Sequence, residues 1–314
     1  MTTSEKLFLV LAEELNFSRA AKKSFISQQA LSEHIKRLEQ YYGLALFIRF
    51  PSVKLTEAGK NVQKTLQAIQ SLEQNLKMEL GKFQNGTFGT IRFGINYTRA
   101  KLLIPTLFEH YHIKYPNIKI ELVLEETVNM QEMMKQGKID SFLGINGIYD
   151  EPLKATLLSY ENIYLIASKK YLIEKLGWEL KNIEDHFTEV ELQNFNGLPF
   201  AMNHSKSTTY QLLNQYMEKN KINLKNLMVV SDYQILENVC RTGYLASFCT
   251  QVYLLIISQN NALYPPDFYL YALPLKDLQK SIHSELVYNQ MLSYPEYVLD
   301  FFNILKESVK EWLV

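Results

Sequence analysis

Side chains that suit contacts with DNA are concentrated in residues 24–43, SFISQQALSEHIKRLEQYYG. Glutamine pairs bidentately with adenine, serine reads base edges less strictly, and Lys and Arg neutralise phosphates. All of these types are present, in Gln28, Gln29, Ser32, Lys36 and Arg37. The stretch also carries Glu33, whose carboxylate the phosphate backbone repels. Taken alone, this pattern fits either a helix that reads DNA or an amphipathic helix on a protein surface.

Polar side chains also follow two predicted strands farther along the chain. Asn96, Tyr97 and Thr98 come after the strand expected at 90–96. The strand expected at 197–203 leads into Asn203, His204, Ser205, Ser207 and Thr208. Each hydroxyl is either a helix N-cap or a ligand contact, but helix N-termini at both places suit a carboxylate. We therefore favour a cleft for a small organic anion or similar polar metabolite, its wall completed by Gly144, Ile145, Asn146 and Phe248.

Other reactive side chains do not combine into a catalytic or metal site. Cys240 and Cys249 are expected within a helix and a strand, as buried structural thiols. His110 and His112 lie two apart on a predicted helix, so they point about 200° apart and cannot share a metal. The sequence has no G-x-S-x-G, Walker, G-x-G-x-x-G or Cys-x-x-Cys motif. We predict a protein that is not an enzyme and has no cofactor and no metal ion.

The composition fits a folded protein of two or three domains. The chain has 314 residues, 47% of them hydrophobic, with 33 basic and 33 acidic residues. Within residues 1–60, nine Lys and Arg face six Glu, an excess that permits a nucleic-acid partner. The two cysteines and the lack of a signal-like or bilayer-length apolar segment predict a cytoplasmic protein with no membrane partner.

The N-terminal residues predict three short helices and a β-hairpin wing. Ser18 and Ser27 are expected to cap the second and third helices. The third helix, 28–42, stops at Gly43 and carries one apolar face made of Leu31, Ile35, Leu38 and Tyr42. Two β-prone pieces, 44–49 and 53–59, surround Pro51 and predict the wing.

A long helix is predicted from Glu57 to about Phe83. Its apolar residues step by three or four positions through Val62, Leu66, Ile69, Leu72, Leu76 and Leu80. A second copy of the helix is the simplest partner for that stripe. We expect a dimer contact made by Val62, Leu66, Ile69, Leu72 and Leu76. The segment QNGTFG, 84–89, is expected to follow the helix as a linker.

The remaining residues alternate between predicted strands and helices. This alternation predicts parallel sheets with helices on both faces. One alternating unit starts near 90 and another near 197, which predicts two α/β lobes with a cleft between them. The residues from Pro295 onward predict a closing helix. Residues 170–196 are polar and irregular, and no element is predicted there.

This order of elements resembles the LysR-type transcriptional regulators. The resemblance is carried by FSRAAKKSFISQQALSEHIKRLEQYYGLALFIR (17–49) and VKLTEAG (53–59). It continues in order through GTIRFGI, LLIPTLFEHYHIKYPNIKIELV, QGKIDSFLGI and LVYNQMLSYPEYVLDFFNIL. It implies a mixed fold class: an all-α-type winged helix-turn-helix, a dimerising linker helix, and a two-lobed α/β effector-binding domain like a type 2 periplasmic binding protein. The implied domains are 1–60, 61–86 and 87–314, with lobe I at about 87–165 and 276–314 and lobe II at about 166–275.

The resemblance also implies site residues and partners. DNA contacts would come from Ser27, Gln28, Gln29, Ser32, Glu33, Lys36, Arg37, Arg49 and Lys54. Glu33 either accepts from a cytosine amino group or pairs with Arg37 at i,i+4, and we favour the pairing. The implied partners are a dyad-symmetric promoter site in double-stranded DNA, a small-molecule inducer, further copies of the chain in a homodimer or homotetramer, and RNA polymerase.

The leading hypothesis is a sequence-specific, LysR-type transcriptional regulator that responds to an inducer bound in the C-terminal cleft. The alternative is a solute-binding protein of the periplasmic-binding-protein type without a DNA-binding role, because residues 90–314 resemble that fold. The N-terminal 60 residues and the lack of a signal peptide argue against this alternative.

Overall fold

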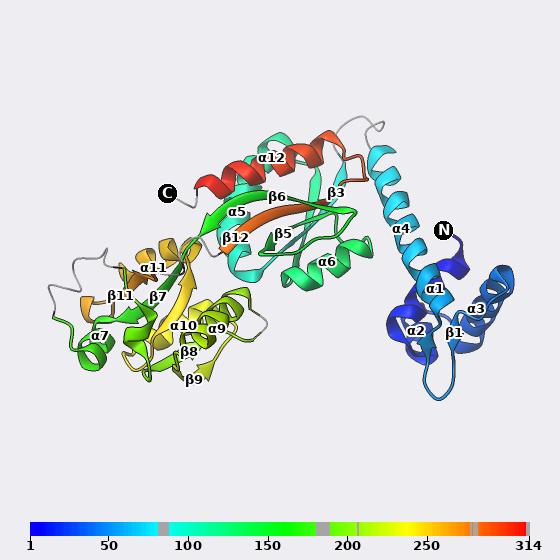
Figure 1. The fold of residues 1–314 in the computed structure, drawn as a ribbon. Coiled ribbons are helices and arrows are strands. Elements are labelled where there is room, and N and C mark those ends of the chain that lie inside the picture. The colour runs from blue at the N-terminus through cyan, green and yellow to red at the C-terminus, as the bar shows by residue number, and fades with distance from the viewer. Residues whose placement is uncertain (81–87, 180–188, 206, 277, 279–281, 312–314) are drawn as a thin grey trace.

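The computed structural model describes residues 1–314 except 81–87, 180–188, 206, 277, 279–281 and 312–314. Figure 1 shows three parts: a small helical unit at the N-terminal end, the long helix α4, and two α/β lobes. The helix α4 connects the small unit to the first lobe and passes close to α6 of that lobe.

The N-terminal unit consists of α1 (Thr3–Glu14), α2 (Phe17–Lys23), α3 (Gln28–Tyr42), β1 (Phe47–Ile48) and β2 (Lys54–Leu55). The predicted ends of α3 are confirmed: Ser27 caps it, and Gly43 stops it in the left-handed region at φ 68°. The predicted cap of α2 is wrong, because Asn16 caps that helix and Ser18 lies inside it. The predicted wing is present as the antiparallel pair of β1 and β2.

The apolar face of α3 packs into the core of this unit. Leu31, Ile35 and Leu38 are buried against α1 and α2, whereas Tyr42, the fourth member of the predicted face, is 37% exposed. Burying one face of α3 leaves the opposite face to the solvent, because side chains three and four apart share a side of a helix.

The helix α4 (Glu57–Leu80) begins inside the N-terminal unit and runs out of it. Its first turn packs so closely on the wing that a Cβ at Gly59 would lie 2.1 Å from the Leu46 carbonyl oxygen. Leu66, two turns later, is 1% exposed within the same core. Farther along, the large apolar side chains become exposed: Ile69, Leu72, Leu76 and Leu80. The predicted linker at 84–89 lies mostly outside the described residues.

The first lobe is built on a five-stranded sheet of order β4-β3-β5-β12-β6. The strands are β3 (Gly89–Ile95), β4 (Ile118–Leu124), β5 (Ser141–Ile145), β6 (Leu153–Glu161) and β12 (Ile282–Asn289). β3 runs parallel to β4 and β5, as predicted, whereas β12 is antiparallel to both of its neighbours. Figure 1 shows α5 (Tyr97–Lys114) and α12 (Glu296–Glu311) on one face of the sheet and α6 (Thr127–Lys135) on the other.

The second lobe contains two small sheets. An antiparallel sheet of order β10-β7-β11 comprises β7 (Ile163–Ser168), β10 (Ser247–Thr250) and β11 (Leu270–Pro274). β8 (Pro199–Met202) and β9 (Lys225–Val229) form a parallel pair. The accompanying helices are α7 (Lys169–Leu176), α9 (Thr208–Asn220), α10 (Tyr233–Arg241) and α11 (Leu254–Asn261). β8 and β9 are parallel, as predicted, and an isolated parallel bridge joins Phe200 of β8 to Ala246, next to β10. The antiparallel sheet was not predicted, because no strands were predicted at β7 and β11, and α7 occupies part of the segment for which no element was predicted.

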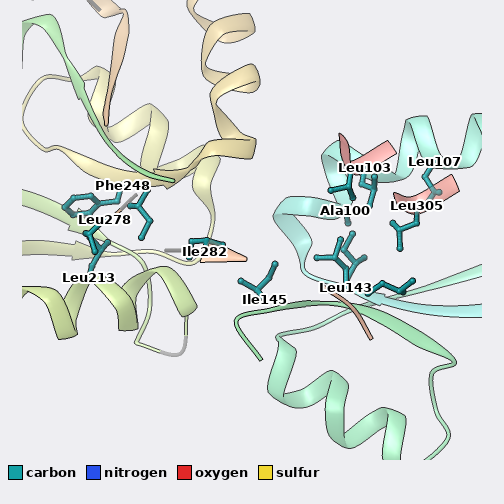
Figure 2. Packing of buried hydrophobic residues seen from close by; sticks show 14 of the residues in the cluster. Ala100, Leu103, Leu107, Leu143, Ile145, Leu213, Phe248, Leu278, Ile282 and Leu305 are labelled. Carbon is teal, nitrogen blue, oxygen red and sulfur yellow. The ribbon is translucent and has the colours of Figure 1, made fainter. Parts of the chain in front are cut away.

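The two lobes share one continuous cluster of buried apolar residues. The chain passes from β6 in the first lobe to β7 in the second at Asn162 and returns between β11 and β12. Ile145 ends β5 and Ile282 begins β12, and Figure 2 shows both side chains between the packed residues of the two lobes. The hydrophobic core thus extends to the place where the lobes meet.

Candidate nucleic-acid interface and ligand cavity

The exposed face of α3 and the wing border an open hollow of about 510 Å³. Its lining consists of Phe17, Gln28, Gln29, Ser32, Arg49 and Val53. Four of these, Gln28, Gln29, Ser32 and Arg49, are residues that the sequence predicts to contact DNA. Gln28 is positioned by Ser18, whose hydroxyl donates to Gln28 Oε1 at 2.9 Å. The fold therefore brings amide, hydroxyl and guanidinium groups from α3 and the wing onto one surface.

Arg49 is oriented by two residues that the sequence did not identify, Glu39 and Phe17. Its Nη2 donates to Glu39 Oε2 at 2.8 Å, and its guanidinium carbon lies 5.6 Å from the centroid of the Phe17 ring. The other oxygen of Glu39 accepts from the backbone N–H groups that open β1, at 2.9 and 3.2 Å. Glu39 thus holds the wing against α3 and fixes the direction of Arg49.

The other predicted DNA contacts, Ser27, Glu33, Lys36, Arg37 and Lys54, are exposed on α3, its N-cap and the wing. Arg37 Nε lies 3.7 Å from Glu33 Oε1, which is the i,i+4 pairing favoured from the sequence. An exposed pair of this kind stabilises a helix by only about 0.3–0.5 kcal/mol. Arg37 could therefore leave Glu33 and pair with a DNA phosphate at a small cost in free energy.

The residues predicted to make a dimer contact fall into two groups. Leu66 is buried within its own N-terminal unit, so its part in the predicted contact is corrected, whereas Val62 is only partly buried there and stays a prediction. Ile69, Leu72 and Leu76 are 37%, 55% and 54% exposed and remain available to a partner. Leu72 also borders a hollow of about 540 Å³ between α4 and the first lobe.

A small cavity of about 70 Å³ lies between the two lobes. Eight residues predicted for a ligand cleft line it: Asn96, Tyr97, Thr98, Ile145, Asn203, His204, Ser207 and Thr208. The N-terminus of α5 reaches it from the first lobe and that of α9 from the second. Ile145 and Ile282 supply apolar lining. The two polar clusters, far apart in the sequence, thus face the same cavity.

Four residues predicted for this cleft do not line the cavity: Gly144, Asn146, Ser205 and Phe248. Asn146 adopts a left-handed φ of 46°, and its side-chain oxygen accepts from the His283 N–H at 2.7 Å. Phe248 is buried in the second lobe and stacks on Phe200, with 5.1 Å between the ring centroids. Ser205 lies in the turn before α9, outside the lining. Each was placed near the cleft by its position after or within a strand, which does not fix the direction of the side chain.

Two charged residues that the sequence did not identify also line the cavity, Arg99 and Glu126. Arg99 is 4% exposed, and its Nη2 donates to both carboxylate oxygens of the buried Glu161 at 2.7 and 2.8 Å. Arg99 Nε has no hydrogen-bond partner among the described residues. Because a buried charge needs a counter-charge, Glu161 accounts for the presence of an arginine here.

Glu126 is the N-cap residue of α6, yet its side chain caps no N–H of that helix within the described chain. Burial raises the pKa of the Glu126 carboxyl, while His204 and Arg99 act in the opposite direction. His204 Nε2 lies 3.9 Å from Glu126 Oε1, across the space between the lobes. The cavity therefore has an acidic side at Glu126 as well as the positive ends of α5 and α9.

The two cysteines are buried, as predicted. Cys240 and Cys249 belong to one apolar cluster in the second lobe, and burial raises the pKa of both thiols. A thiol held in its neutral form is a poor nucleophile and a poor metal ligand. Among the described residues, no group of three or more His, Cys, Asp or Glu side chains could hold a metal ion.

Two family models together match most of the chain. Residues 4–60 match the bacterial regulatory helix-turn-helix proteins of the lysR family, and residues 84–309 match the LysR substrate binding domain. The helix-turn-helix match spans α1–α3 and the wing, and the second match spans both lobes. In the part of the chain that the structure describes, no helix is long and apolar enough to cross a membrane.

Individual relatives agree with these matches. The uncharacterized HTH-type transcriptional regulator YcgK of Bacillus subtilis is 30% identical over 169 residues, which is 54% of this chain and 51% of the relative. The chain thus spans about half the length of that relative. A full-length OxyR variant from Pseudomonas aeruginosa has a similar fold, with a TM-score of 0.65 at 17% identity, covering 99% of this chain and 95% of the other. CbnR, in a structure with its target DNA, gives a TM-score of 0.58 at 16% identity and covers 97% and 98% of the two chains.

Proposed function

The chain belongs to the LysR family of DNA-binding transcriptional regulators, whose role is not enzymatic. We propose that this protein acts as an oligomer on double-stranded DNA under the control of a small ligand. We assign DNA binding to residues 1–60, oligomerisation to 61–86, and ligand binding to 87–314, with lobe I at about 87–165 and 276–314 and lobe II at about 166–275. We also propose that the protein acts in the cytoplasm, because the matched helix-turn-helix family is bacterial and bacterial DNA lies in that compartment. We further propose that the DNA-bound protein contacts RNA polymerase.

The observation that carries DNA binding is the surface shared by α3 and the wing. Gln28, Gln29 and Ser32 lie near the N-terminal end of α3, where helix-turn-helix proteins contact base edges. Arg49 borders the same hollow from the wing, and Lys36, Arg37 and Lys54 are exposed nearby on the same elements. Amides suit base edges and cations suit phosphates, so the surface combines specificity with affinity.

A gel shift with the promoter regions next to the gene tests DNA binding. We expect a retarded complex whose affinity falls more than tenfold between about 50 and 200 mM salt, because each neutralised phosphate releases condensed counterions. A fragment of unrelated sequence serves as the control. The proposal is excluded if none of the promoter fragments shifts in the presence or absence of cell extract.

Two substitutions on α3 separate base contacts from phosphate contacts. Gln29→Ala is expected to weaken the cognate site by roughly 1–3 kcal/mol and to leave random DNA unaffected. Lys36→Ala is expected to weaken both DNAs equally and to lower the salt slope by about one. Titrations of each variant on both DNAs at several salt concentrations distinguish these outcomes. Equal losses on both DNAs for Gln29→Ala would mean that this glutamine reads no base.

The cavity between the lobes is the proposed ligand site. Asn96, Tyr97, Thr98, Asn203, His204, Ser207 and Thr208 supply amide, hydroxyl and imidazole groups there, and two helix N-termini favour negative charge. We therefore propose a small polar ligand with an anionic group. Closure of the lobes on this ligand would change the position of the first lobe relative to α4. Because α4 begins inside the DNA-binding unit, that movement would be transmitted to the unit.

A further inference from the structure

The acidic residue in the ligand cavity is not explained by an anionic ligand. Glu126 lines the cavity, but its carboxylate does not cap the helix that begins there. The basic group that faces it is His204 Nε2, and the 3.9 Å separation is longer than a hydrogen bond. The Glu126 side chain is 46% exposed, and among the described residues no basic side chain approaches its carboxylate more closely than this, so a cationic group of a ligand can still reach it.

The opposite part of the cavity has unused capacity for an anion. Ser207, the N-cap residue of α9, is 8% exposed, and its hydroxyl caps no N–H within the described part of that helix. Arg99 donates two hydrogen bonds to Glu161, but its buried Nε has no partner among the described residues. Together with the N-termini of α5 and α9, these groups form a positive subsite whose donors are not all satisfied.

The cavity is lined by the acidic and basic side chains Arg99, Glu126 and His204. Arg99 is neutralised by Glu161, and Glu126 stands against His204, whose charge depends on its protonation. A purely anionic ligand would place its negative charge near the Glu126 carboxylate and would gain no binding energy from that residue. A ligand that also carries a cationic group would satisfy Glu126 and the positive subsite at once.

We propose that the cavity binds a small zwitterion, an α-amino acid, with its carboxylate at the N-termini of α5 and α9 and its ammonium group at Glu126. This inference rests on the proposed ligand-binding function and specifies its chemistry. Size agrees with a short side chain: a water molecule needs roughly 10–15 Å³ of such space, and the cavity offers about 70 Å³. The space exceeds that needed by one water, and glycine and alanine are the smallest amino acids with which to probe it.

Calorimetric titration of the full chain tests the proposal with matched probes. Glycine and alanine are compared with acetate and propionate, which lack the amino group, and with ethylamine, which lacks the carboxylate. We expect at least one amino acid to bind tenfold or more tightly than its matched acid and than ethylamine. Acids that bind as tightly as the amino acids, or no binding by either amino acid, overturn the proposal.

Variants at position 126 give a second, independent readout. Glu126→Gln should weaken amino-acid binding at least tenfold and leave acetate and propionate unchanged, and Glu126→Lys should reverse the preference towards the acids. Glu125→Gln is the matched control, since Glu125 is the adjacent acid and bonds to Asn129 on α6 instead of lining the cavity. Binding of acids alone would overturn the zwitterion and leave the proposed ligand-responsive function standing. Loss of the DNA shift in the wild type would instead defeat the proposed function.

Discussion

Replacing Glu237 with alanine is expected to destabilise the second lobe by about 3–5 kcal/mol. Glu237 is fully buried and accepts hydrogen bonds from Arg241 Nη2 at 2.5 Å, Tyr253 OH at 3.1 Å and Asn260 Nδ2 at 2.9 and 3.0 Å. Without this carboxylate, the charge of Arg241 would remain buried with only neutral acceptors. The large cost comes from that unpaired cation and not from the attraction that is lost.

Urea denaturation of the full chain measures the effect as a shift of the midpoint of the lobe's unfolding transition. Glu191→Ala is the matched control, because Glu191 pairs with Lys276 at 3.0 Å while both side chains are more than half exposed. We expect that control to lose less than about 1 kcal/mol. Equal losses in the two variants would show that the buried network does not depend on its charge.

The second large effect is expected from the exposed part of α4. Ile69 and Leu76 lie seven residues apart on one side of the helix and are 37% and 54% exposed. Placing glutamate at both positions should dissociate the proposed oligomer, because like charges would face each other across the proposed contact between two helices. A monomer binds each half of a dyad-symmetric site separately, so affinity for the whole site should fall by roughly 10²–10⁴-fold.

Sedimentation and DNA titration of the double variant Ile69→Glu, Leu76→Glu check both consequences together. Leu263→Glu introduces one glutamate at an apolar residue that is 79% exposed in the second lobe, and it controls for the change of residue type. Unchanged mass and unchanged DNA affinity in the double variant would exclude α4 as the contact between copies. Leu66→Ala is unsuitable for this purpose, because Leu66 belongs to the core of the N-terminal unit and its loss would unfold that unit.

Features set by a few neighbouring residues could be predicted from the sequence. The bounds of α3 follow from a serine at one end and a glycine at the other, each acting within a turn of the helix. The cap of α2 was misassigned because Asn16 and Ser18 are both cap-forming residues two positions apart, and the pattern alone does not choose between them.

Features that depend on distant partners were beyond the sequence. β6 pairs with β12 across more than a hundred residues, and its antiparallel direction leaves no local signal. Arg99 reads as an ordinary helix residue until Glu161, 62 positions later, is found beside it. The sequence around Phe248 predicts a strand but does not indicate towards which face of the sheet its ring points. In the structure, packing on Phe200 fixes the direction of the ring. The polar lining of the cavity was easier to predict, because strand ends and helix starts carry a recognisable composition.

The burial of Leu66 and the tight packing at Gly59 have a geometric consequence for the DNA that the protein selects. With its first turns fixed in the N-terminal unit, α4 has no joint before Leu80, since its described residues run as one uninterrupted helix without proline. Rotation at its far end therefore reaches α3 as the same rotation. Each residue of an α-helix adds about 1.5 Å and about 100°. In the proposed oligomer paired through α4, the length of α4 would thus help to set both the spacing and the rotational phase of two DNA-binding units along the double helix.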